Sequence, residues 1–424
     1  MGGMTAAEKI FAAHAGKERT HAGEIVTASV DRILLHDITG PLAIDQLKAM
    51  GAERVAAPDK VVLVGDHYSP PPDPAAAGLL SLMARFAAEN GIPHLFVNGE
   101  GIEHTLLPER GLLRPGDLVI GTDSHTCTAG AFGALGTGMG SSDIAAAMAL
   151  DELWFMVPET IRVAFSGKRR RYVTGKDLIL RLLGEITVDG GTYRCIEFVG
   201  DAIAGLNLDE RMALCNMAVE GGAKTCFVPP DETTRSWARA THGDAGLAAA
   251  VSSDEDAAFA SSLSFDASAL TPLCARPYSP DNVAPVAETS GVRIDQAYIG
   301  NCANGTMTDL RQAAEILAGR KIAKGVRCVV VPATREIYRQ AMREGLLETL
   351  LDAGAIIAPS TCGACAGLHM GVLGEEQVAV ATTNRNYRGR MGAASSRVYL
   401  ANAYVAAASA VAGELIDPSE VTGQ

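Results

Sequence analysis

The sequence has few aromatic residues and a deficit of positive charge. Only 5% of its 424 residues are Phe, Trp or Tyr, whereas 45 are Gly. Few aromatics and many small residues favour closely packed α/β layers over a β-sandwich. Lys and Arg number 36 against 49 Asp and Glu, so the net charge is −13. This balance argues against binding to nucleic acid, which requires a basic surface.

The chain also lacks the usual signals for secretion and for membrane insertion. Residues 1–19 are too charged for the apolar part of a signal peptide. The longest uncharged stretch near the C-terminus, 398–413, is too short to span a bilayer, and we interpret it as a buried Ala-rich helix. The nine cysteines are odd in number and scattered, which is a poor disulfide framework. We therefore expect a cytoplasmic protein that contacts neither membrane nor nucleic acid.

The hydrophobic pattern predicts three α/β units. Short apolar runs alternate with helical patterns, as in the predicted strand 61–64, the helix 79–91 and the strand 117–121. We expect units at 1–160, 161–285 and 286–424. The Pro-rich end of a polar segment, 271–285, is interpreted as a linker into the third unit.

Three cysteines form the strongest local motif. Cys362 and Cys365 are spaced Cys-x-x-Cys, and Cys302 lies in a Gly- and Asn-rich segment. This pattern leaves three interpretations open: a redox or incidental thiol pair, a zinc site with His369 as fourth ligand, or an iron–sulfur cluster. Three thiolates on a [4Fe–4S] cluster leave one iron without a protein ligand, and that iron can act as a Lewis acid.

Histidines beside carboxylates follow two predicted strands. These pairs are Asp66-His67 and Asp123-Ser124-His125, and His104 lies in the same unit. A single histidine is usually structural, but two such pairs at strand ends are harder to dismiss. A carboxylate favours the protonated imidazole and orients it, which makes a general acid.

Two further groups have both a functional and a structural interpretation. Asn216 and Glu220 are four residues apart, so we expect them on one helix face, where Glu220 could reach an imidazole of the first unit. A solvated helix face is the alternative. The loop 384–390 contains three arginines, which suit an anionic substrate, although a basic surface turn is possible.

The Gly-rich segment 133–143 does not match a dinucleotide-binding fingerprint. It lacks the third Gly or Ala, and no acidic residue ends the next strand. We expect its glycines to allow close packing against the cysteine site or the next unit. An NAD-dependent oxidoreductase is therefore the least favoured class.

Taken together and in this order, the motifs resemble the aconitase superfamily over essentially the whole chain. The similar segments include GDH, GIEHTLLPERG, GTDSHTCTAGAFGALGTGMGSSD, CNMAVEGGAK and the Cys and Arg motifs. Within the superfamily the sequence is most similar to the short large subunits of the 3-isopropylmalate dehydratase and homoaconitase type. The resemblance implies three α/β/α-layered domains around a central [4Fe–4S] cluster, without the family's swivelling fourth domain.

The resemblance also implies roles for individual residues. The cluster ligands are Cys302, Cys362 and Cys365, and one iron lacks a protein thiolate. The acid–base and hydrogen-bonding positions are Asp66, His67, His104, Asp123, His125 and Glu220. The substrate-contacting positions are His36, Ser124, Asn216, Asn384, Arg385 and Arg390. We expect His67 to protonate the departing hydroxyl.

The implied reaction is the reversible dehydration of a 2-hydroxy di- or tricarboxylate through an alkene, as in leucine biosynthesis. In aconitases the base that removes the carbon-bound proton is a serine of the swivelling domain. Because the sequence ends at Gln424, soon after the third unit, we expect a separate small subunit to supply that domain. A homoaconitase, a dimethylmalate or citramalate dehydratase, and a non-catalytic cluster or zinc protein are the alternatives.

The chain departs from the family pattern around the cysteines. The usual Gly-Ser-Cys-Thr-Asn-Gly-Arg is replaced by residues 300–306, with Asn301, Ala303 and Thr306 at the changed positions. Thr308 replaces a customary acidic residue, and Ala364 replaces a frequent Pro. The ligand cysteines are retained, so we expect these changes to alter only the hydrogen bonds around the cluster.

Overall fold

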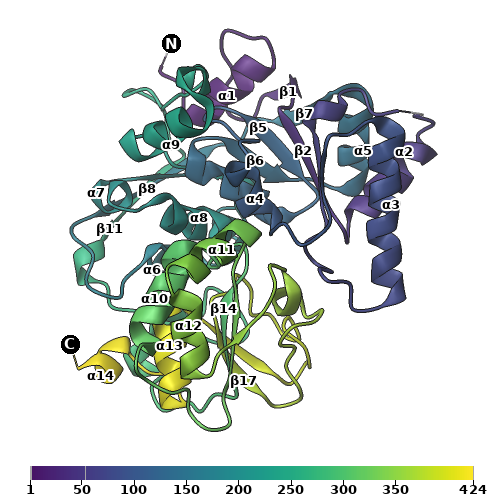
Figure 1. Ribbon diagram of the computed structural model, residues 1–424. Helices are drawn as coiled ribbons and strands as arrows, with labels where there is room; N and C mark the ends of the chain where they lie inside the picture. Colours follow the sequence, from purple (N-terminus) through teal and green to yellow (C-terminus); the bar gives the residue numbers. More distant parts are fainter. Residues whose placement is uncertain (1, 53, 424) are drawn as a thin grey trace.

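The computed structural model describes residues 2–52 and 54–423. It contains three mainly parallel β-sheets with helices packed on them, and one small two-stranded ribbon. In Figure 1 the first sheet lies at the upper right, the second at the left and the third at the bottom, and α4 and α8 lie where they meet. The expected α/β architecture of parallel sheets is therefore confirmed.

The first sheet has five parallel strands in the order β4-β3-β2-β5-β6. The strands are β2 (Arg32–His36), β3 (Val61–Val64), β4 (His94–Phe96), β5 (Leu118–Gly121) and β6 (Leu135–Gly138). The helices are α1 (Ala6–His14), α2 (Gly40–Ala49), α3 (Pro74–Asn90), α4 (Glu103–Glu109) and α5 (Ser141–Leu150), with 3-10 turns η1 (Pro58–Lys60) and η2 (Ser124–Phe132). An antiparallel ribbon pairs β1 (Ile25–Ser29) with β7 (Glu152–Met156).

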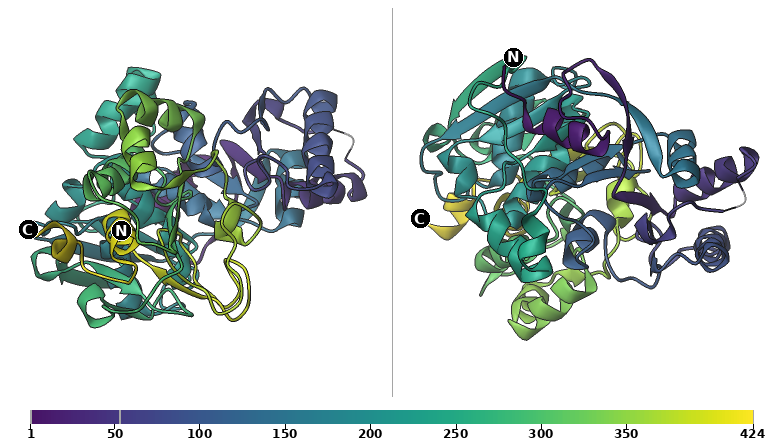
Figure 2. Two further views of the ribbon diagram at one scale, coloured as in Figure 1. Left: turned by 60° about the horizontal axis from the view of Figure 1, so that its bottom comes forward. Right: turned by 90° about the horizontal axis from the view of Figure 1, so that it is seen from above.

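Local sequence explains these elements. All four residues of β3 are buried, as expected for a strand covered on both faces. Helix α3 begins after Asp73, whose side chain accepts a hydrogen bond from the Ala76 amide, and ends at Gly91 with a φ of 68°. Both views of Figure 2 place this helix at the outer edge of the molecule.

The second sheet has four parallel strands in the order β10-β9-β8-β11. The strands are β8 (Thr160–Ser166), β9 (Cys195–Val199), β10 (Thr225–Phe227) and β11 (Ser261–Asp266). The helices are α6 (Gly175–Ile186), α7 (Asp201–Ala204), α8 (Leu208–Asn216) and α9 (Glu232–His242), with 3-10 turns η3 (Met217–Gly221), η4 (Asp244–Leu247) and η5 (Ala267–Ala269).

The third sheet has seven strands in the order β13-β12-β18-β17-β14-β15-β16, and only the pairs made by β12 are antiparallel. The strands are β12 (Leu273–Ala275), β13 (Val283–Pro285), β14 (Gln296–Gly300), β15 (Arg327–Val331), β16 (Ile356–Ile357), β17 (Val378–Ala381) and β18 (Arg397–Leu400). The helices are α10 (Met307–Leu317), α11 (Arg335–Arg343), α12 (Leu346–Ala353), α13 (Ala403–Ala412) and α14 (Pro418–Thr422), with 3-10 turns η6 (Val286–Glu288) and η7 (Gly363–Ala366).

Two expectations are settled by these elements. The segment 398–413 contains strand β18 and the buried Ala-rich helix α13, so the expected buried helix is confirmed. The interpretation of 271–285 as a linker is wrong, because β12 and β13 pair within the third sheet. Proline is tolerated there because β13 is an edge strand. The unit limits at 160 and 285 stay a prediction.

Among the described residues no helix is long and apolar enough to cross a membrane.

Candidate active site

The polar residues of the first unit lie where parallel strands end. His36 is the last residue of β2, Asp66 and His67 follow β3, and Asp123 follows β5. These three strands are neighbours in the sheet, so their carboxyl ends bring the side chains together. The expectation that both Asp/His pairs follow strands is confirmed.

His67 is held in its charged form beside a neutral histidine. Its Nδ1 lies 2.7 Å from Asp66 Oδ1, and its ring stacks on His36 with centroids 4.2 Å apart. Burial favours neutral His67, but the carboxylates of Asp66 and Asp37 outweigh it and raise the pKa of His67 well above its usual range. Burial and the charge of His67 lower the pKa of His36 to about 4.

His125 bridges two carboxylates. Its Nδ1 lies 3.1 Å from Asp123 Oδ1, and its Nε2 lies 2.8 Å from Glu220 Oε1. Burial and the charge of Arg385 oppose protonation, but these two carboxylates prevail and raise the pKa of His125 to about 9. His104 Nε2 also reaches Asp123 Oδ1, at 3.3 Å. Glu220 thus contacts an imidazole of the first unit.

One arginine joins this network to the third sheet. Arg385 Nε donates to Glu220 Oε1 at 2.8 Å, and its Nη2 donates to Ser124 Oγ at 2.8 Å. A pocket of about 430 Å³ opens beside Ser124 and is also lined by Lys224. Side chains from all three sheets therefore meet at one place.

The helix-face prediction for Asn216 and Glu220 needs correction. Asn216 is the last residue of α8, and Glu220 lies in the following turn, η3. The change of helix type separates their roles: Glu220 reaches His125, whereas Asn216 Nδ2 lies 3.2 Å from Cys302 Sγ. Both side chains are buried, so a solvated helix face is excluded.

The three cysteines of the motif are buried, and side-chain amides contact two of them, Cys302 and Cys365. Asn384 Nδ2 lies 3.4 Å from Cys302 Sγ, and Asn301 Nδ2 lies 3.2 Å from Cys365 Sγ. Amide donors directed at sulfur stabilise thiolates, and such hydrogen bonds are a feature of iron–sulfur sites.

A single zinc ion fits this donor set poorly. Thiolates on one tetrahedral zinc lie about 3.8 Å apart, given a Zn–S bond of about 2.3 Å. Among the described residues, no three-ligand group with all ligand atoms within 4.8 Å of one another contains the cysteines. His369 Nε2 instead lies 2.8 Å from the carbonyl oxygen of His67. Separated thiolates with amide donors fit an iron–sulfur cluster better.

The cysteine loop is tied to the acid–base residues through the backbone. The Cys362 amide and the Thr361 hydroxyl both donate to the carbonyl oxygen of Asp66, at 2.9 and 2.8 Å. His369 bonds the next carbonyl, that of His67. The position of His67 therefore depends on the loop that carries Cys362.

The remaining arginines of the loop differ in their surroundings. Arg388 is exposed and stacks on Tyr278, with its Cζ 4.4 Å from the ring centroid. Arg390 is half-buried, and its Nε is a buried donor without a hydrogen-bond partner among the described residues. Of the two, only Arg390 has an unused buried donor for an anionic ligand.

The Gly-rich segment packs β6 against η2, the turn that begins with Ser124 and His125. A Cβ at Gly136 would lie 2.0 Å from the Thr126 carbonyl oxygen, and one at Gly138 would lie 2.7 Å from the Ser124 Cα. Gly133 abuts Pro230 of the second unit. The expected close packing against the next unit is confirmed.

The changed residues near Cys302 are built into local hydrogen bonds. Thr306 caps α10 in a reciprocal arrangement with Asp309. The Thr308 hydroxyl donates to Asp209 at 2.7 Å and so links α10 to the second unit. Ala364 is fully buried.

Two site residues escaped the sequence reasoning. Asp37 accepts hydrogen bonds from the His67 and Tyr68 amides, at 3.1 and 2.8 Å. Glu103 is buried, and burial together with nearby Asp66 raises its pKa well above the usual range. Both residues could have been found from the sequence, because each is next to a histidine of the site. Asp37 follows His36 and Glu103 precedes His104, as in the other carboxylate–histidine pairs.

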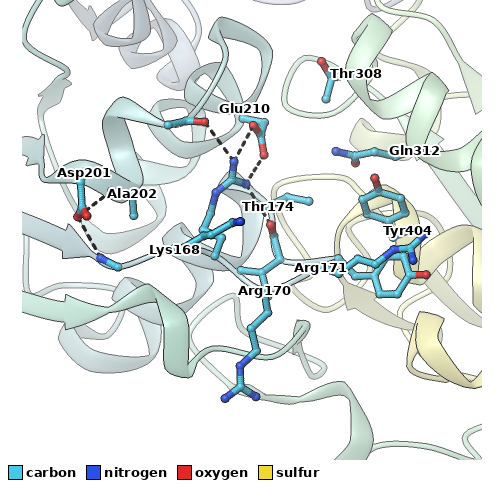
Figure 3. Close-up of a pocket in the computed structure, with 15 residues that line it drawn as sticks. Lys168, Arg170, Arg171, Thr174, Asp201, Ala202, Glu210, Thr308, Gln312 and Tyr404 are labelled. Carbon is cyan, nitrogen blue, oxygen red and sulfur yellow. Dashed lines mark hydrogen bonds and ion pairs between the residues drawn. The ribbon is translucent and has the colours of Figure 1, made fainter. Parts of the chain in front are cut away.

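A larger pocket of about 850 Å³ lies elsewhere, after the carboxyl ends of β8 and β9. Figure 3 shows Lys168, Arg170, Arg171 and Tyr404 among its lining residues. Arg169, which also lines it, donates to Glu210 Oε1 at 2.5 Å. None of the predicted site residues is among the described residues that line it. Although this pocket is larger than the one beside Ser124, its described lining residues include none of the predicted catalytic residues, so we do not assign the reaction to it.

Comparison with known proteins agrees with this geometry. The model of the aconitase family (aconitate hydratase) matches residues 8–291 and 287–413. The chain is 51% identical to the 3-isopropylmalate dehydratase large subunit of Nitratidesulfovibrio vulgaris over 98% of this chain and 99% of that protein. It is 48% identical to large subunit 1 of the same enzyme from Methanopyrus kandleri, over 98% and 99%, and from Pyrococcus furiosus, over 99% and 100%.

The family match covers most of the chain, and the similar proteins align along nearly their full length. Members of this family are hydro-lyases that carry a [4Fe–4S] cluster, and the buried cysteines are consistent with one. The motifs, the meeting of three sheets at one site and these matches lead to the same conclusion: the chain belongs to the aconitase family.

Proposed function

We propose that the chain is the cluster-bearing large subunit of a 3-isopropylmalate dehydratase. The reaction would interconvert 2-isopropylmalate and 3-isopropylmalate by losing water to an alkene and adding it back at the neighbouring carbon. The network that joins His125, Glu220, Arg385 and Ser124 beside the three cysteines is the observation that carries this proposal. The names of the similar large subunits support the choice of substrate.

Cys302, Cys362 and Cys365 would hold a [4Fe–4S] cluster. When bound, the cluster supplies an iron that lacks a protein thiolate and serves as a Lewis acid toward hydroxyl and carboxylate oxygens. Asn216, Asn301 and Asn384 direct amides at the cysteine sulfurs and so stabilise the thiolate form.

His67 is our candidate for the acid that protonates the departing hydroxyl. The raised pKa of His67 keeps a proton on its ring near neutral pH, and Asp66 orients the ring. His104 and His125 share the carboxylate of Asp123, which fixes both rings. His36 stacks on His67, and both its ring nitrogens have partners, Nδ1 the Ile38 amide and Nε2 the Thr39 hydroxyl, so we assign it to holding the His67 ring in place beside the substrate.

Arg385 and Arg390 would bind the two carboxylates of isopropylmalate. Arg385 is fixed by Glu220 and Ser124, whereas the Nε of Arg390 is a buried donor with no partner among the described residues. Ser124, Asn216 and Asn384 would contact the substrate between them. We assign the removal of the carbon-bound proton to a separate small subunit, because the similar proteins are named large subunits.

Anaerobic co-expression with a 3-isopropylmalate dehydratase small subunit tests the proposal. We expect alkene formation from 2-isopropylmalate by the loaded pair and none by the large chain alone. Preference for homocitrate, citramalate or dimethylmalate would contradict the substrate assignment. Full turnover without a partner would contradict the two-subunit assignment, and inactivity on all of these and on citrate would refute the hydro-lyase.

A further inference from the structure

Two buried polar groups near the cysteines have no role in the proposed reaction. Tyr298 lies in β14, and its side chain is fully buried. Its hydroxyl has no hydrogen-bond partner among the described residues. A buried hydroxyl without a partner is costly and rare in native proteins, so it indicates a missing acceptor.

The surroundings of Tyr298 indicate where this acceptor would be. The ionisable groups that act on its phenol are Cys365, Cys362 and Cys302. A phenol has an ordinary pKa of about 10, so it keeps its proton near neutral pH and is a hydrogen-bond donor. The three proposed cluster ligands are therefore the ionisable neighbours of the unpaired hydroxyl.

Lys176 is the second unexplained group. It lies in the first turn of α6 and is fully buried. Its Nζ donates to the carbonyl oxygens of Thr382 and Thr383, at 2.9 and 2.6 Å, and among the described residues no salt bridge includes it. Buried ammonium groups require nearby negative charge.

The ionisable groups around Lys176 include two of the cysteines. They are Asp177, Cys302, Asp309 and Cys365. A [4Fe–4S] cluster with three thiolates would add negative charge at this place, where the lysine forms no ion pair with any residue that the structure describes. The cluster would therefore supply the negative charge that stabilises the buried Lys176 ammonium.

The contacts of Lys176 also lead to the cysteine segments. The Thr382 hydroxyl bonds both the amide and the carbonyl of Gly300, at 2.9 and 3.0 Å, two residues before Cys302. Asn384, just after Thr383, lies 3.4 Å from Cys302 Sγ. Helix α6 of the second unit thus supports the strand ends of the third.

We propose that Tyr298 and Lys176 are positioning residues for the cluster: the Tyr298 hydroxyl donates a hydrogen bond to a cluster or thiolate sulfur, and the Lys176 ammonium balances the charge of the cluster. This inference rests on the proposed function, in which the three cysteines hold the cluster. Hydrogen bonds and positive charge near a cluster stabilise its more negative, reduced form and so raise its reduction potential.

Tyr298→Phe is the first test, because it removes only the unpaired hydroxyl. We expect the melting temperature of the cluster-free chain to stay the same, while the reduction potential of the loaded chain becomes more negative and the cluster is lost faster in air. Tyr404→Phe is the matched control, because its hydroxyl bonds Glu315. An unchanged potential and cluster lifetime in the Tyr298 variant would overturn its role.

Lys176→Met and Lys176→Gln test the charge. Both should shift the potential to more negative values, and Gln can still donate to the threonine carbonyls. Lys60→Met, which breaks a surface pair with Asp151, is the control and should leave the potential unchanged. A wild-type potential in both variants would overturn the role of Lys176, and so would failure of both to fold, which would show that the ammonium supports the fold. Absence of a cluster from the unmodified chain would instead refute the proposed function.

Discussion

The acid–base residues of the first sheet and the cysteine region of the third sheet satisfy their polar groups differently. In the first, His67 pairs with Asp66, and His104 and His125 share Asp123. The exception there is an acceptor, Glu103 Oε2, which is buried without a partner among the described residues. In the third, amides point at cysteine sulfurs, and the Tyr298 hydroxyl and the Arg390 Nε have no partner among the described residues. Both regions lie at the ends of parallel strands.

This difference indicates which part of the site is organised by the chain alone. Paired carboxylates and imidazoles orient each other without a ligand, so the acid–base residues are prepared in advance. Unpaired buried donors around thiols indicate that the cysteine region is completed by what it binds. Loss of the cluster should therefore disturb the two regions unequally.

Cys362→Ser should have the largest effect. It removes a proposed ligand, so we expect loss of the cluster and of activity, because no iron would remain to polarise the hydroxyl. Iron and sulfide analysis with an assay in the presence of the small subunit checks this. Cys328→Ser, at a buried cysteine outside the motif, is the control. Retention of the cluster in the Cys362 variant would disprove its ligand role.

His67→Asn should separate the two regions. We expect kcat to fall by about a hundredfold to ten-thousandfold, the usual range for loss of a general acid, while iron and sulfide stay at wild-type levels. Cluster analysis beside steady-state kinetics provides the measurement. Near wild-type kcat would remove His67 from the acid role.

Glu220→Gln should have a smaller effect with a defined pH signature. Loss of its charge weakens the hydrogen bonds to His125 and Arg385, and we expect kcat/KM to fall by about ten- to a hundredfold. The pKa of His125, raised to about 9, should fall toward 6.5. The ring then loses its proton at lower pH, so the alkaline limb of the kcat/KM profile should move to lower pH. An unmoved limb would contradict this role of Glu220.

The smallest expected effect is in hydrogen exchange. Loading the cluster should slow exchange of amides in 300–306 and 361–367 by about tenfold, because binding stabilises the segments that it joins. Amides in 122–126 should change less, because the surrounding side chains are already paired. Equal slowing in both regions would contradict the comparison.

Much of this site could be predicted from sequence because its residues follow regular elements. The apolar run of β3 marks a strand end, and Asp66 and His67 come directly after it. The order of the motifs then identified the family. The sequence suggested that Glu220 could reach an imidazole of the first unit. It did not predict that α8 would end at Asn216 and continue as the turn η3, which places Glu220 against His125.

Other features depend on tertiary packing and carry no local signal. Lys176 and Tyr298 are ordinary residues of a helix and a strand, and only their burial beside the cysteines makes them notable. Residues 271–285 contain the prolines typical of a loop, yet they extend the third sheet at its edge. Edge pairing of this kind depends on a distant partner, β18.

Quantifying iron and acid-labile sulfide in the anaerobically purified chain, followed by an assay on 2-isopropylmalate with the small subunit, tests the central claim most directly. The account predicts about four irons and four sulfides per chain and alkene formation only when both cluster and partner are present. Stoichiometric zinc without sulfide, or isopropylmalate turnover by the cluster-free chain, would contradict it.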